Sequence, residues 1–86
     1  MNTAFLLMAQ YEGKVVIPVA DVCRDYFSHL TPEKFLWKQQ RGEISLPVVR
    51  IEDSQKCAKG VPIEDLAAYL DQRMAAARKE VRQLIR

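Results

Sequence analysis

Side chains that commonly bind metals are scarce in this chain, which has one histidine, His29, and two cysteines, Cys23 and Cys57. The cysteines lie 34 positions apart, outside any CxxC spacing, so the three side chains do not make a zinc-binding pattern. Two cysteines also do not form the disulfide framework of a small secreted domain, and we expect both thiols to be reduced. The sequence therefore indicates a cytoplasmic protein without a metal or cofactor.

Glycines and long apolar runs are also few. The three glycines, at positions 13, 42 and 60, are too far apart to form a phosphate-binding loop. The apolar stretch from Ala4 to Ala9 is too short to cross a bilayer or to form the core of a signal peptide. We therefore expect neither a bound nucleotide nor a membrane partner.

Groups spaced as in a catalytic site are missing as well. Asp21 and Asp25 are one helical turn apart, but two acids near the start of a helix more often complement its dipole on the surface. His29 has no nucleophile or acid partner by motif, and neither cysteine has a feature that would activate a thiolate. The sequence gives no reason to expect an enzyme.

The size and the charge distribution point to association with partners. A chain of 86 residues can form one domain with a small core, and domains of this size often gain stability by self-association. The net charge is only +2, but residues 72–86 carry five bases against one acid, and residues 31–62 carry six against four. Residues 63–71 carry three acids and no base. Two basic zones around an acidic one are compatible with contact to phosphate groups.

The order of the expected elements is helix, helix, helix, β-hairpin, helix. Caps, prolines and apolar spacing predict helices over Asn2–Gln10, Pro18–Phe27 and Pro32–Arg41, and a last helix from Glu64 towards Arg86. We interpret Lys14–Ile17 as an extended lead rather than a strand, and expect strands over Ile44–Ile51 and Lys59–Ile63. The fold class is mainly α with a small β-hairpin: a winged helix-turn-helix of the excisionase or MerR-like kind, with a long C-terminal helix.

The third expected helix has the features of a DNA recognition helix. Lys34, Lys38 and Arg41 recur on one face, where they could neutralise phosphates, and Arg41 could instead reach a guanine edge. Gln39 is a candidate to contact adenine and Trp37 a sugar or base step. The expected β-hairpin would be the wing, with Lys56 near its tip and Lys59 on its return strand. Arg50 should face the opposite side of its strand from Val49 and Ile51. The candidate DNA-binding residues are Thr31, Lys34, Trp37, Lys38, Gln39, Arg41, Arg50, Lys56 and Lys59.

Each part of this interpretation has a simpler alternative. Charged residues on a helix face are usually just solvated, and lysines in a hairpin loop often belong to a mobile polar loop. The DNA-binding hypothesis gains weight because the basic helix follows a proline-started helix and precedes a hairpin.

A heptad pattern runs along the last helix. Apolar residues recur at alternating spacings of four and three, at Ile63, Ala67, Leu70, Met74, Ala77, Val81 and Leu84. The part up to Leu70 can pack on its own domain, whereas the part from Met74 onwards needs another copy or a partner helix. We therefore divide the chain into a DNA-binding domain, residues 1–73, and an oligomerisation extension, residues 74–86. The expected oligomerisation residues are Leu70, Met74, Ala77, Val81 and Leu84.

Several stretches carry a resemblance to a known family. Over residues 2–75, and above all in VCRDYF, LTPEKFL, GEI, LPVVRIE, SQK and DLAAYLD, the chain resembles the pyocin activator (PrtN-type) family of bacterial and prophage transcription regulators. Residues 42–73 are more loosely similar to small winged proteins of the excisionase and AlpA type. The resemblance implies a DNA-binding activator that switches on bacteriocin or phage-tail-like genes after DNA damage.

The sequence thus leads to one main hypothesis and two alternatives. The main hypothesis is a sequence-specific transcriptional activator that binds double-stranded promoter DNA as a homodimer or higher oligomer in the bacterial cytoplasm, at the nucleoid. Direct contact with RNA polymerase stays open. The alternatives are an excisionase-like protein that bends DNA, and a helical protein-interaction module without DNA contact.

Overall fold

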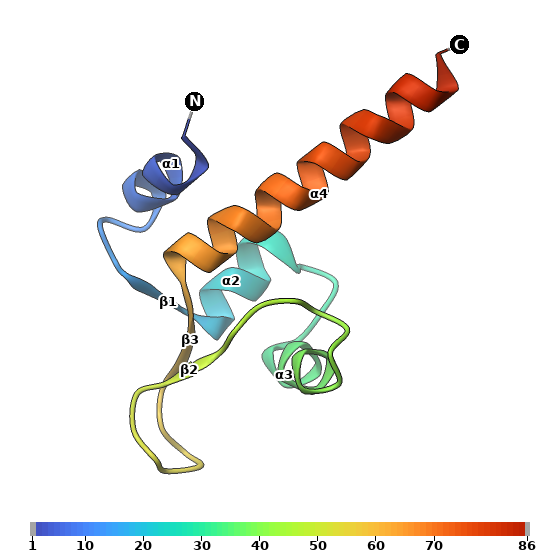
Figure 1. Ribbon diagram of the computed structural model, residues 1–86. Helices are drawn as coiled ribbons and strands as arrows, with labels where there is room; N and C mark the ends of the chain where they lie inside the picture. The colour runs from blue at the N-terminus through green and yellow to red at the C-terminus, as the bar shows by residue number, and fades with distance from the viewer. Residues whose placement is uncertain (1, 86) are drawn as a thin grey trace.

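The computed structural model describes residues 2–85 and shows a mixed α/β domain with a long last helix (Figure 1). Met1 and Arg86, the two ends of the expected domains, lie outside the described residues. In chain order the elements are α1 (Thr3–Gln10), β1 (Val16–Pro18), α2 (Val19–Tyr26), α3 (Pro32–Gln40), β2 (Val49–Arg50), β3 (Lys59–Pro62) and α4 (Ile63–Leu84).

The starts of α1 and α3 are fixed by side-chain caps, as the sequence predicts. The Asn2 side chain accepts a hydrogen bond from the backbone N–H of Phe5 at 3.3 Å, and the Thr31 hydroxyl accepts one from that of Lys34 at 3.2 Å. Just after α3, Gly42 has a φ of 77°, a left-handed conformation that ends the helix at little cost for glycine. Local sequence therefore sets both ends of α3.

The interpretation of Lys14–Ile17 as a lead without a strand is wrong. Val16–Pro18 forms β1 and pairs antiparallel with β3, with Ile17 opposite Val61, so the hairpin becomes a three-stranded sheet in the order β1-β3-β2. Gly60 allows this approach, because a Cβ there would lie 2.5 Å from Val16 Cγ1 and 2.7 Å from the Ile17 carbonyl oxygen. Pro18 therefore ends a strand and occupies the N-cap position of α2, instead of lying in the first turn of that helix.

The strand expected over Ile44–Ile51 is much shorter than predicted. Only Val49–Arg50 pairs with β3. Pro47 cannot donate to a ladder, and before it Ile44 and Leu46 are buried in the core as loop residues. Burial of their side chains thus replaces sheet pairing over most of this apolar run.

The core lies between the sheet and helices α2, α3 and α4, and Leu7 of α1 is also part of it. Its fully buried side chains are Phe35, Ile17, Leu66, Val22 and Val61. Phe27 of the turn after α2 meets Phe35 edge to face, with ring centroids 5.1 Å apart. This contact anchors α3 to the core. In Figure 1, α3 and the loop between β2 and β3 lie at one end of the molecule, whereas α1 lies beside α4 at the other and α4 projects past it.

Candidate nucleic-acid interface

The outer face of α3 presents a basic and aromatic surface. Phe35 is completely buried, and helical geometry therefore turns Lys34, Trp37 and Arg41 outwards, where all three are exposed. The Trp37 side chain is 55% exposed, and the guanidinium carbon of Arg41 lies 4.4 Å from the centroid of its ring. This cation–π contact gives Trp37 a role that sequence alone left open, because the ring supports Arg41.

Glu43 partly neutralises this surface, a role that the helical pattern did not predict. Arg41 Nε lies 3.0 Å from Glu43 Oε2, and Lys38 Nζ lies 4.0 Å from Glu43 Oε1. The Arg41 and Glu43 side chains are 57% and 43% exposed, so the pair is worth at most about 1 kcal/mol and phosphate could displace the carboxylate. The glycine at position 42 could have indicated this pair, because a turn there brings Glu43 back towards the end of α3.

Gln39 takes a different place from the basic residues of α3. Its side-chain nitrogen Nε2 donates a hydrogen bond of 3.0 Å to the carbonyl oxygen of Leu46, in a half-buried position. This bond fastens the loop after α3 to the helix, so the amide donor is engaged inside the protein. The structure therefore does not bring Gln39 together with Lys34 on the exposed face.

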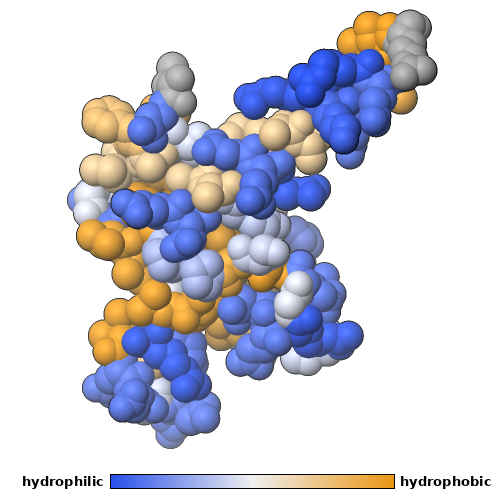
Figure 2. Space-filling model, in the orientation of Figure 1, coloured by the Kyte–Doolittle hydropathy of each residue, from blue (hydrophilic) through white to orange (hydrophobic). Residues whose placement is uncertain are grey.

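The loop between β2 and β3 carries the second group of candidate residues. Lys56 is exposed near its tip, Arg50 Nη2 lies 3.5 Å from Gln55 Oε1, and Lys59 Nζ donates to the Gln55 carbonyl at 3.0 Å. Lys59 is only half-exposed because it folds back onto the loop. In Figure 2 this loop and the α3 region form two hydrophilic projections at the same end of the molecule, with a notch between them.

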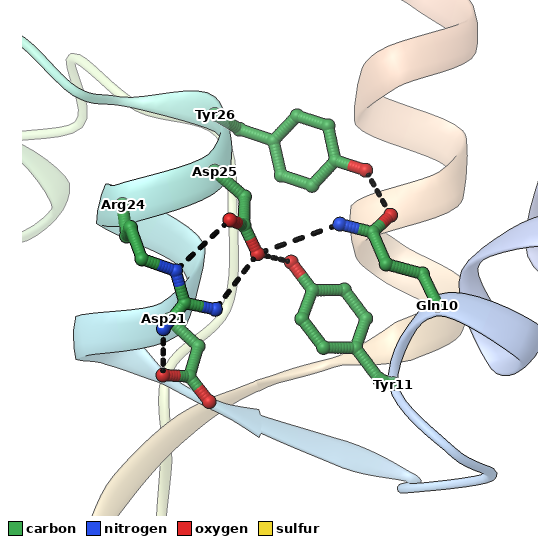
Figure 3. Close-up of polar contacts among 6 residues, drawn as sticks. All are labelled: Gln10, Tyr11, Asp21, Arg24, Asp25 and Tyr26. Atoms are coloured by element: carbon green, nitrogen blue, oxygen red, sulfur yellow. Dashed lines mark hydrogen bonds and ion pairs between the residues drawn. The ribbon is translucent and has the colours of Figure 1, made fainter.

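A polar cluster between α1 and α2 explains the two acids considered as catalytic candidates (Figure 3). The Asp25 carboxylate accepts hydrogen bonds from the Tyr11 hydroxyl at 2.6 Å, from Gln10 at 3.4 Å and from the Arg24 guanidinium at 3.1 and 3.2 Å. Arg24 also pairs with Asp21 at 3.1 Å. The cluster joins α1 and its following turn to α2 through these hydrogen bonds and ion pairs.

The pKa values of this cluster reflect its hydrogen bonds. The Arg24 guanidinium and then the Tyr11 hydroxyl hold the pKa of Asp25 below its usual range. Burial, followed by the hydrogen bond to Asp25, raises the pKa of Tyr11 well above its ordinary value. Asp25 is therefore the charged acceptor and Tyr11 the neutral donor at any pH near neutrality. Elsewhere, burial raises the pKa of the Cys23 thiol, which is the opposite of activation.

The seam of α4 changes from covered to open along its length. Leu70 is half-buried, whereas Met74, Ala77, Val81 and Leu84 are exposed. Between α1 and α4 lies an open groove of about 690 Å³, whose apolar lining comes mainly from Leu6, Leu7, Tyr26, Leu70, Met74 and Ala77. Among residues 2–85 there is no cluster of three potential metal ligands, and no helix there is long and apolar enough to cross a membrane.

These features define a small mixed α/β domain in which α3 presents basic side chains on its outer face. The family model described as Pyocin activator protein PrtN matches residues 3–77, which is most of the chain. The chain therefore belongs to the pyocin activator family, and the resemblance seen in the sequence is confirmed. The family description is that of a regulator and supports activation of pyocin genes as its role. No curated protein and no solved structure matched the chain.

Proposed function

We propose that this chain activates transcription of pyocin genes by binding promoter DNA sequence-specifically. In this proposal α2 and α3 form a helix-turn-helix, β2 and β3 with their loop form a wing, and α3 enters the major groove. The observation that carries the proposal is the exposed row of Lys34, Trp37 and Arg41 on a helix anchored by the buried Phe35. Membership of the pyocin activator family supplies the regulatory context.

The residues of the α3 surface would have different tasks on DNA. Lys34, near the start of the helix, suits a phosphate contact, since a lysine acts as a flexible point charge. Arg41 is supported by the Trp37 ring, and a planar guanidinium in a fixed position suits bidentate contact with a guanine edge. Lys38 is half-buried beside Glu43 and can reach a phosphate only from the side of the helix.

The wing provides a second contact in this proposal. Lys56 is the exposed basic residue near the loop tip, and Arg50 lies on the adjoining strand. Because Figure 1 shows the loop and α3 at the same end of the molecule, one duplex could meet both. Contacts of this kind position the protein on the backbone without reading sequence.

The test measures binding to duplex DNA from the region upstream of pyocin genes. Fluorescence anisotropy gives the affinity, and footprinting gives the protected sequence. Lys34→Ala or Arg41→Ala should weaken binding by about 1 to 3 kcal/mol and leave the thermal transition almost unchanged. Lys79→Ala, which removes an exposed charge from the distal part of α4, is the matched control and should bind like the parent.

Three outcomes would replace the proposal. If Lys34→Ala and Arg41→Ala bind like the Lys79→Ala control, α3 is not the recognition helix. If the parent protein shows no salt-dependent DNA binding, the chain acts as a protein-interaction module, since phosphate contacts make affinity fall steeply with salt. Binding that bends phased DNA without activating a promoter would indicate an architectural role.

A further inference from the structure

Two apolar surfaces of the domain lack cover within residues 2–85. Phe5 and Leu6 of α1 are 69% and 50% exposed, and Leu84 of α4 is 84% exposed. Figure 2 shows hydrophobic side chains over α1 and beside the first part of α4, next to the projecting end of α4. A helix with apolar residues on nearly every side, such as α1, is normally buried on more than one side. We therefore expect a partner to cover these surfaces.

We propose that the partner is a second copy of this chain, whose α4 packs antiparallel along the groove between α1 and α4. The groove is lined in part by Leu70, Met74 and Ala77, where the seam of α4 passes from half-buried to exposed. In an antiparallel pair of heptad helices, Leu70 meets the partner's Val81, and Met74 meets the partner's Ala77. Leu6 and Tyr26 also line the groove, and in this dimer they pack against the partner helix.

The charges beside the seam select this orientation. One flank carries Asp71 and Arg78, and the other carries Arg73 and Glu80, all exposed. In an antiparallel pair, equal flanks face each other, so Asp71 meets the partner's Arg78 and Arg73 meets the partner's Glu80, each pair occurring twice. Asp71 Oδ1 already accepts a hydrogen bond from the Thr3 hydroxyl, which leaves its second carboxylate oxygen for the partner.

In a parallel pair of α4 helices, the charges that face each other across the seam do not match. Opposite flanks then face each other, and Arg73 meets the partner's Arg78 on both sides of the seam. Like charges at these positions oppose pairing, so the sequence of charges disfavours the parallel dimer. The basic end of the partner's α4 would also fall beside residues 63–71, which carry acids and no base.

The first test measures association by sedimentation equilibrium. The parent should be a dimer, and Arg73→Glu should raise the dissociation constant about tenfold, since two attractive pairs become repulsive. Arg73→Glu combined with Glu80→Arg should restore the parent value, because the pair is only exchanged. Tighter association of Arg73→Glu would indicate a parallel dimer, and a monomeric parent at 100-fold the concentration used for DNA binding would overturn the proposal.

The second test measures the orientation directly. A spin label at Gln83→Cys in a Cys57→Ser background reports the distance between the two α4 ends, while the buried Cys23 stays unlabelled. In the antiparallel register position 83 faces the partner's position 68, which displaces the two labels by about 23 Å along the helix axis at 1.5 Å per residue. Labels lying directly side by side, or no dipolar coupling between copies, would overturn the proposal.

The antiparallel dimer does not depend on DNA binding, so experiments can refute either one and leave the other intact. A monomer that binds promoter DNA would overturn the dimer and keep the proposed function, and an antiparallel dimer without DNA affinity would do the reverse. Where both hold, the two-fold axis adds an expectation for the binding site on DNA. The protected sequence should be an inverted repeat, because the symmetry of a dimer is mirrored in its half-sites.

Discussion

Substituting Glu43 is a direct test of the proposed DNA-binding surface, because its carboxylate lies close to both Lys38 and Arg41. Substituting Glu43→Gln keeps the side-chain shape and removes the charge that lies 3.0 Å from Arg41 and 4.0 Å from Lys38. An exposed pair of this kind is worth up to about 1 kcal/mol, so freeing Arg41 should tighten binding by about twofold to fivefold. Stability should fall by no more than about 1 kcal/mol.

The salt dependence of binding makes this prediction specific. If a freed cation gains one phosphate, the slope of log K against log salt should steepen by about 0.9. Anisotropy titrations on one promoter duplex at several salt concentrations give both affinity and slope. Glu12→Gln, which makes the same charge change in the turn between α1 and β1, is the control for net charge. Equal behaviour of the two variants would refute the placement of the Arg41 edge against DNA.

Two further predictions concern the contacts that hold the fold. Tyr11→Phe removes a 2.6 Å hydrogen bond to Asp25 and should cost about 1 to 2 kcal/mol at pH 7. Because the folded-state pKa of Asp25 is lowered, this stability is present above the unfolded pKa and is lost as the pH falls through the folded value. Urea titrations at pH 7 and pH 3 should show the difference shrinking, whereas Tyr26→Phe, which loses a hydrogen bond to the neutral Gln10, should cost the same at both. Gly60→Ala places a Cβ against the Val16 side chain and the adjoining backbone, so it should destabilise by about 2 kcal/mol in the same assay, and parent-like stability would contradict the pairing of β1 with β3.

The elements that the sequence predicted well are those whose start and end are marked by residues within or directly beside the element. For α3, the Thr31 cap, Pro32 in the first turn and Gly42 after the end each act over a few residues. The strand β1 was missed because it has only three residues and owes its existence to β3, more than forty positions away. A strand of that length has no periodicity of its own, and the signal lies in the missing side chain of Gly60.

The candidate site shows a similar division. Helical spacing places Lys34 and Arg41 correctly on the outer face, because periodicity fixes directions around an axis. It does not show that Lys38 turns towards Glu43 or that Gln39 bonds to Leu46, since both partners belong to the loop that follows the helix. The loop conformation depends on the burial of its apolar residues, which is a tertiary effect that no local pattern contains.

The two proposed surfaces are compatible with each other because Lys34 and Arg41 do not line the groove. The groove beside Leu70 and Met74 lies between α1 and α4, whereas α3 and the β2–β3 loop lie at the opposite end (Figure 1). A dimer formed along α4 would therefore leave both copies of Lys34 and Arg41 free to meet DNA. Each copy would contribute one α3, and pairing would bring two weak phosphate-contacting surfaces onto one duplex, where binding by the first raises the effective concentration of the second. For a domain with a modest excess of positive charge, this linkage provides affinity that one copy of α3 lacks.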